Sequence, residues 1–139
     1  MVEGKAEQLE EIYSFSVKDQ EDGVREAEEA GYEIVKGTPS LLVLDLDDEE
    51  SIRHYQELVY WCADVEEVAR WHSKSGTGLH VTLEVYPDKE IKERLLLQAL
   101  LGSDRVKEYL SWRYVEDGGD PDLATVLFKP TEKTKKEQG

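Results

Sequence analysis

Three segments of the chain carry the apolar patterns of β-strands. The first contains the runs YEIVKG (32–37) and LLVLDLD (41–47), which are separated by Pro39 and Ser40. β-branched and aliphatic residues between turn residues are typical of buried strands. We therefore predict a hairpin here that leads into a central strand.

The second segment, 68–86, predicts two strands joined by a glycine-containing turn at 75–78. In its second strand His80 faces away from the more apolar side, because apolar and polar residues alternate there. The apolar residues are Leu79, Val81, Leu83 and Val85. The third segment, LATVLF (123–128), predicts a last strand.

Helical spacing occupies the segments between and before these strands. After the LLVLDLD run, apolar residues recur at intervals of three and four, which predicts a helix with one buried stripe. They are Ile52, Tyr55, Leu58, Val59 and Cys62. Residues 5–13 and 21–30 predict short surface helices, the second ended by Gly31. Two more helices are expected at about 89–101 and 103–112.

The order of these elements predicts an α+β or mixed α/β protein, of which we favour α+β, with a small, mostly antiparallel sheet in one layer and helices packed on it. A length of 139 residues suffices for one domain with a real core and is too short for two ordinary ones. We expect a single compact domain over 1–130 and a charged, flexible tail over 131–139.

The balance of acidic and basic residues excludes some classes of nucleic-acid-binding protein. The chain has 32 acidic and 17 basic residues, and its net charge of −15 excludes a histone-like or basic-patch DNA binder. An acidic protein can still bind nucleotides if divalent cations supply the positive charge at the site. The single cysteine, Cys62, permits neither an internal disulfide nor a cysteine-based zinc site.

The same composition bears on the protein's surroundings. No segment has the roughly 18 uninterrupted apolar residues that a membrane span requires. We therefore expect a soluble, cytoplasmic protein that has no membrane partner. The high Glu and Lys content is a hint of a thermophilic source.

Two carboxylates, Asp45 and Asp47, are expected on one face at the end of the second strand. Mg²⁺ is commonly held by one or two carboxylates while substrate phosphates complete its shell. A simpler interpretation is that the acids from Asp47 to Glu50 cap the following helix. That interpretation does not explain Asp45, because a carboxylate in an otherwise apolar strand loses hydration without compensation.

The segment SKSGTGLH (73–80) is a second candidate for ligand chemistry. Gly76 and Gly78 let the backbone turn tightly and approach a ligand closely. Its phosphate-compatible donors are Lys74, Ser75, Thr77 and His80. The spacing is not that of a P-loop. The alternative is an ordinary glycine-containing turn decorated with polar side chains.

Together the two motifs, LLVLDLDD (41–48) and SKSGTGLHVTL (73–83), resemble the archaeo-eukaryotic primase superfamily, including the polymerase domain of bacterial end-joining ligases. There, a strand ending in D-x-D carries two metal ligands, and a later S-G-x-G-x-H strand holds the phosphates of the incoming nucleotide. The resemblance covers 41–83 and implies a primase-polymerase-like core in which Asp45 and Asp47 bind Mg²⁺ or Mn²⁺. It also implies nucleotide binding by Lys74, Ser75, Gly76, Gly78 and His80.

The superfamily completes its metal site with a third acid, which this sequence does not mark cleanly. We favour Asp104 in LLGSDRVKEYL, because it follows an apolar run and is trailed by Arg105 and Arg113. Asp104 could equally be a helix cap. The other candidates are Asp117, Asp120 and Asp122.

The resemblance implies a DNA primase/polymerase-like nucleotidyltransferase that joins an NTP or dNTP to a primer or an initiating hydroxyl. Its partners would be single-stranded DNA and a helicase or another protein of viral or plasmid replication. One alternative is an inactive nucleotide- or single-strand-binding accessory module, with Trp61, Trp71 and Trp112 as stacking platforms. The other is a haloacid-dehalogenase-type phosphatase, whose D-x-D-x-T/V pattern is broken here by Glu49.

Overall fold

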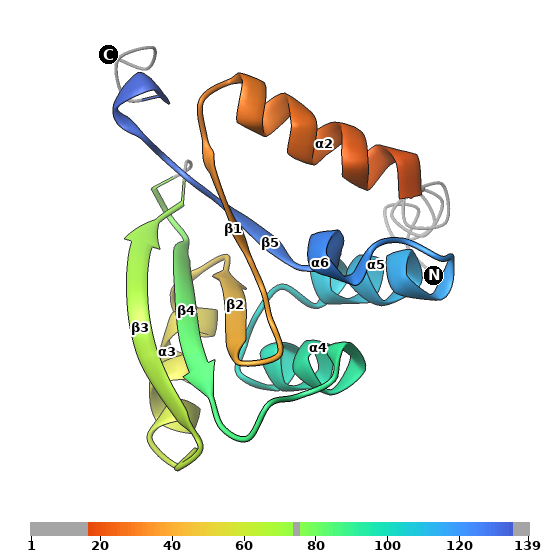
Figure 1. Ribbon diagram of the computed structural model, residues 1–139. Coiled ribbons are helices and arrows are strands. Elements are labelled where there is room, and N and C mark those ends of the chain that lie inside the picture. Colours follow the sequence, from red (N-terminus) through yellow and green to blue (C-terminus); the bar gives the residue numbers. More distant parts are fainter. Residues whose placement is uncertain (1–16, 74–75, 135–139) are drawn as a thin grey trace, which may run out of the picture.

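The computed structural model describes residues 17–73 and 76–134 of the chain (Figure 1). The described elements, in chain order, are α2 (Val17–Glu29), β1 (Glu33–Lys36), β2 (Leu41–Leu46), α3 (Glu49–Val59), β3 (Val65–His72), β4 (Leu79–Val85), α4 (Ile91–Leu100), α5 (Arg105–Glu116), α6 (Pro121–Ala124) and β5 (Val126–Lys129). The protein belongs to the α+β class, with helices beside small antiparallel sheets, as the sequence predicts.

The strands form two antiparallel sheets rather than one layer. Strands β2, β4 and β3 form the first sheet in that order, and β1 pairs with β5 in the second. Figure 1 shows α2 running beside the β1-β5 ribbon, while α3 lies behind the three-stranded sheet. The two sheets touch where β2 contacts β5, so both contribute side chains to the surface around the end of β2.

The predicted hairpin into a central strand is wrong on both counts. Strand β1, from the YEIVKG run, pairs with β5, and β2 lies at the edge of its sheet. Side chains satisfy the outward N–H groups of β2: Gln98 Oε1 accepts from Val43 N at 3.0 Å and Ser103 Oγ from Asp45 N at 2.9 Å. Because these side chains cover the edge, β2 is as apolar as a central strand, and its composition does not reveal its position.

The main core lies between the three-stranded sheet and α3. Leu42, Leu44 and Leu46 of β2 are fully buried and belong to one cluster with the alternate apolar residues of β4. Helix α3 contributes the buried ring of Tyr55. Its partly buried residues against this cluster are Ile52, Leu58 and Val59, followed by Cys62. The stripe predicted on α3 and the alternation predicted in β4 are confirmed.

The helix boundaries differ from the predictions in several places. Helix α2 begins at Val17, earlier than predicted, and Gly31 follows it in the left-handed conformation with φ 98°. Helix α5 continues past its predicted end to Glu116, and the short α6 lies in the segment expected to be a loop. The helix predicted at 5–13 lies outside the described residues.

The first residues of the expected tail pack on the domain. Thr131 Oγ1 donates to Gly31 O at 2.6 Å, and Thr134 is buried. Residues 135–139 lie outside the part of the chain that the structure describes. None of the helices in the described ranges has the length and apolar character needed to cross a membrane.

Candidate functional site

Three carboxylates meet at the end of β2. One oxygen from each of Asp45, Asp47 and Asp104 lies within 4.8 Å of the other two. Asp45 and Asp47 come from the strand end, as predicted, and Asp104 comes from the connection between α4 and α5. In the described ranges no other group of three potential metal-ligating side chains is this close. We call these three residues the acidic triad.

Backbone contacts bring Asp104 to β2. Its N–H donates to the carbonyl of Asp45 at 2.8 Å, on the edge of β2 that lacks a strand partner. Asp104 also caps α5, because its Oδ1 accepts from Val106 N at 3.0 Å. The helix-cap role is therefore confirmed, and the same residue lies close enough to Asp45 and Asp47 to be a candidate metal ligand. The other candidates lie elsewhere: Asp117 ends α5, and Asp120 and Asp122 lie at the start of α6.

A buried polar network holds the α4–α5 connection in place. Ser103 Oγ accepts from Asp45 N and donates to Glu108 Oε1 at 2.9 Å. Gln98 Nε2 donates to Glu108 Oε2 at 2.8 Å and to Thr125 Oγ1 at 3.1 Å. Since Gln98 also holds Val43 N, the network joins α4, α5 and β2 immediately behind the acidic triad. Burial raises the pKa of Glu108 to about 7, although both hydrogen bonds oppose the shift.

His80 faces the acidic triad from the neighbouring strand. It lies directly opposite Asp45 in the β2-β4 register, with its Nε2 3.3 Å from Asp45 Oδ1. The ring of Trp71 on β3 meets the imidazole edge to face, at 5.6 Å between centroids. The second ring nitrogen, Nδ1, is buried and has no hydrogen-bond partner among the described residues. The imidazole therefore lies beside the acidic triad and lines a hollow with Asp45.

Lys107 is a member of the site that the sequence did not single out. Its Nζ lies 3.7 Å from Asp45 Oδ2 and donates to the carbonyl of Val126 at 3.0 Å. A lysine on a helix is ordinarily solvated, and nothing in the local pattern distinguishes this one. Its position depends on β5, which crosses beside α5 only in the folded chain. Lys107 supplies positive charge next to the acidic triad.

The pKa values of Asp45 and Asp47 are shifted in opposite directions. Burial acts to raise the pKa of Asp45, but the hydrogen bond from His80 and the charge of Lys107 outweigh it and hold the pKa below 3.8. Loss of hydration and the charges of Asp45 and Asp104 raise the pKa of Asp47 to about 6. The carboxylates therefore repel one another, and a cation bound between them would relieve that repulsion.

The glycine turn comes close to the backbone at the end of β2. A Cβ atom on Gly78 would lie 2.8 Å from Leu46 O and 3.4 Å from Asp47 O, so this glycine allows the turn to approach the end of β2. Gly76 has φ 77° and open space around it. Both line a hollow with the acids Asp48, Glu49 and Glu50, whereas His80 lines a different one. Lys74 and Ser75 lie outside the described residues.

Two hollows border the acidic triad, each with a volume of about 350 Å³. The first, which we call the α2 cavity, is lined by Asp45, His80 and Lys107 of the site, together with Asp19, Gln20, Gly23 and Val24 of α2 and Val126 and Phe128 of β5. The second, which we call the α3 hollow, includes Asp47, Asp48, Glu50 and Asp104, with His54 and Arg105. The acidic triad therefore lies between a mixed-charge cavity and a strongly acidic one.

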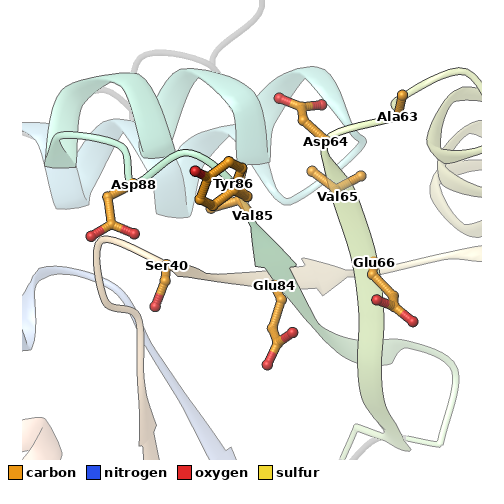
Figure 2. Close-up of a pocket in the computed structure, with 9 residues that line it drawn as sticks. All are labelled: Ser40, Ala63, Asp64, Val65, Glu66, Glu84, Val85, Tyr86 and Asp88. Carbon is orange, nitrogen blue, oxygen red and sulfur yellow. The ribbon is translucent and has the colours of Figure 1, made fainter.

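A further hollow lies at the opposite end of the three-stranded sheet (Figure 2). It has a volume of about 630 Å³ and contains none of the predicted site residues. Its acidic residues are Asp64, Glu66, Glu84 and Asp88. Glu66 and Glu84 lie directly opposite each other in the β3-β4 register. Like charges directly opposite each other destabilise a sheet. The four acids also make this end of the sheet negative, so it would repel a polyanion.

The donor set of the acidic triad fits a hard divalent cation. Carboxylate oxygens suit Mg²⁺ and Mn²⁺, while the softer thiolate ligands that select other metals are absent from this group. His80 and Lys107 would lie beside such a cation as partners for an anionic ligand. A scan against protein-family models, a search of curated proteins and a search of solved structures each found no match to this chain.

Proposed function

We propose that this protein is a metal-dependent nucleotidyltransferase of the primase/polymerase type, built on a primase-polymerase-like core. The observation that carries the proposal is the meeting of Asp45, Asp47 and Asp104 with His80, from three separate parts of the chain. Each motif alone has an ordinary structural interpretation. Their convergence around one point matches what the resemblance to the primase superfamily implies.

In the proposed reaction, the hydroxyl of a primer or of an initiating nucleotide attacks the α-phosphorus of a nucleoside triphosphate in line. A new O–P bond forms, the bond to the β-phosphate oxygen breaks, pyrophosphate leaves, and the hydroxyl proton passes to solvent. Mg²⁺ or Mn²⁺, when bound, supplies neutralising charge for the phosphates and the attacking oxygen.

The chain's own residues have separate tasks. The acidic triad holds the cation, and the network behind it fixes the position of Asp104 through Ser103. His80 and Lys107 bind phosphate oxygens and align the chain of the triphosphate. Because Lys107 is held by the carbonyl of Val126, its ammonium is already in place before a ligand binds.

The accessory-module alternative retains one supporting feature. Trp61 is 79% exposed and meets the equally exposed Tyr60 edge to face at 5.5 Å, which leaves an aromatic surface for stacking. Trp71, in contrast, packs on His80. The phosphatase alternative gives no task to the contact between His80 and Asp45. An assay for turnover therefore separates the nucleotidyltransferase from the accessory module most directly.

The test is primer extension by the full chain with Mn²⁺ and either NTPs or dNTPs. We expect incorporation by the wild type and a loss of about 100-fold or more in Asp104→Asn. Asparagine keeps the helix cap, so the fold should persist and only a metal ligand is weakened. Asp117→Asn, at another of the acids considered from sequence, is the matched control and should retain full activity.

Two results would contradict the proposal. Unchanged incorporation in Asp104→Asn would show that the acidic triad is not the reaction site. Nucleotide or single-strand binding by the wild type without any incorporation would favour the accessory module instead.

A further inference from the structure

The α2 cavity lies next to the acidic triad, and the proposed mechanism gives no task to its side chains from α2 and β5. It is lined by Asp45, His80 and Lys107 of the site and by residues of α2 and β5. A volume of about 350 Å³ falls within the range of small-molecule sites. A ligand with phosphates at the triad would therefore have space for its remaining part between α2 and β5.

The wall formed by α2 is held in place. Gln20 Nε2 donates to the carbonyl of Leu123 at 2.8 Å, which fixes the helix to the segment before β5. Val24 is buried, and α2 contacts both β1 and α6. These contacts anchor α2 at residues that line the cavity.

Charge distinguishes the two hollows that border the triad. The α3 hollow contains four acids against Arg105 and His54. The α2 cavity contains two acids, and one of them, Asp45, lies beside both Lys107 and His80. A triphosphate is a polyanion, so it enters the α2 cavity at lower electrostatic cost than the α3 hollow.

The wall formed by β5 offers an aromatic surface. Phe128 lines the cavity and is 37% exposed. Its ring lies 6.3 Å from that of Tyr32, and its carbonyl accepts from Trp71 Nε1 at 3.4 Å. Aromatic side chains stack on bases of any sequence, because every base has a π-face. The cavity thus combines phosphate donors at one end with a stacking surface on one wall.

Gly23 leaves α2 without a side chain at one of the positions where this helix lines the cavity. It lies inside α2, where glycine is less favourable than every ordinary residue except proline. Its φ is not in the left-handed region, and a Cβ atom there would meet nothing within 4 Å. Neither backbone conformation nor packing therefore explains the glycine. A side chain at this position would project into the space that the ligand needs.

We propose that the α2 cavity holds the sugar and base of the nucleoside triphosphate, with the base on Phe128, and that Gly23 keeps the cavity open. This inference rests on the proposed function, because it places the phosphates against His80 and Lys107 at the triad. It assigns α2 a direct part in the binding of the nucleotide.

The test is calorimetric titration of dATP and of ATP into the full chain with Mn²⁺ and without primer. We expect Gly23→Leu to raise the dissociation constant by at least about tenfold, and Gly23→Ala by less. Affinity for Mn²⁺ alone should not change, and the melting temperature should stay equal or rise because helix propensity improves. Ala30→Leu, which adds the same apolar bulk at an exposed site after α2, is the matched control.

The outcomes separate this inference from the proposed function. Equal nucleotide affinity in wild type, Gly23→Leu and Gly23→Ala overturns the inference, while loss of incorporation in Asp104→Asn would still support the nucleotidyltransferase. Weaker binding in the Gly23 variants without incorporation by the wild type supports the cavity and overturns the reaction. A wild type that binds neither nucleotide overturns both.

Discussion

Asp104 combines a helix cap with a place in the acidic triad. Its Oδ1 caps α5 through Val106 N, and one of its oxygens lies within 4.8 Å of ligand atoms from Asp45 and Asp47. An ionised carboxylate has about four lone-pair sites, so a cap and a metal contact are compatible. A helix N-terminus also stabilises negative charge, which partly offsets the repulsion from the other two acids. The two interpretations of this residue from sequence were therefore not exclusive.

A substitution at Gly78 tests the effect of a single residue on the site. Its Cβ would meet Leu46 O, Ser73 Oγ at 2.9 Å and Asp47 O, two of them backbone atoms that cannot move freely. We expect Gly78→Ala to lower the free energy of unfolding by about 1–3 kcal/mol and to displace Asp47. Urea unfolding measures the first effect, and titration with Mn²⁺ should show weaker binding.

Gly76→Ala is the control in the same turn. Its φ of 77° makes alanine unfavourable by about 1–2 kcal/mol, but its Cβ meets nothing. It should therefore lose stability without losing affinity for Mn²⁺. Equal affinities for Mn²⁺ in both variants would show that Gly78 does not position Asp47.

Several residues of the site could be predicted from sequence, and others could not. Asp45 stood out because a carboxylate in an apolar strand needs a partner, and His80 because it ends the SKSGTGLH motif; the two lie opposite each other in the sheet. Lys107 gave no such signal, because its contacts are made with β5 and β2, far away in the sequence. The reason for Gly78 is also tertiary, since it depends on the approach of two backbones.

Local sequence patterns predicted whether a segment is a helix or a strand better than they predicted which strands pair. The alternation in β4 and the stripe on α3 reflect burial on one side, which is readable from sequence. The pairing of β1 with β5 joins distant segments, and Glu33 opposite Lys129 becomes recognisable as a favourable pair only once that register is known. Strand β2 was misplaced because α4 and the α4–α5 connection supply the side chains that protect its edge.

The network that joins α4, α5 and β2 predicts a dependence on pH. Burial raises the pKa of Glu108 from 4.5 to about 7, so the folded chain binds this proton more tightly than the unfolded chain. The contribution to stability is complete below about pH 4.5, falls as pH rises, and is lost above about pH 7. The change amounts to roughly 3 kcal/mol at most.

Glu108→Gln isolates this effect from the other titrating groups. Its free energy of unfolding should rise relative to that of the wild type as pH increases from 4.5 to 7, because glutamine needs no proton to be neutral. Chemical denaturation at a series of pH values measures the difference. Parallel curves for the two proteins would show that Glu108 does not change its protonation on folding.

For the whole molecule, the net charge of −15 means that cation binding at the triad must be distinguished from general attraction of cations to the acidic surface. A cation that binds only the folded triad should raise the free energy of unfolding by about 2.7 kcal/mol at a concentration 100 times its dissociation constant. Thermal unfolding with Mn²⁺ and with Mg²⁺ measures this shift. We expect Asp104→Asn to lose most of it and Asp117→Asn to keep it.

The contrary result is also informative. An equal gain for wild type and Asp104→Asn would mean that the ions act on the acidic surface in general. High concentrations of sodium chloride would then reproduce the gain, because screening of diffuse charge does not require a particular site.

The class of the molecule followed from sequence, while its arrangement did not. The strand and helix patterns predicted α+β or mixed α/β, and the antiparallel pairing in both sheets assigns the chain to α+β. The division into two sheets depends on where β1 and β5 lie, and that is decided by the whole core rather than by either strand. The hydrogen bond from Thr131 to Gly31 likewise joins residues 100 positions apart, and no local pattern predicts it.

The covered edge of β2 has one more consequence. The contacts that carry Asp104 to Asp45 also occupy the main-chain groups to which a foreign strand would otherwise attach. Damage to the α4–α5 connection should therefore abolish cation capture and, in the same event, open a template for self-association. Loss of function and loss of solubility would then share a single origin.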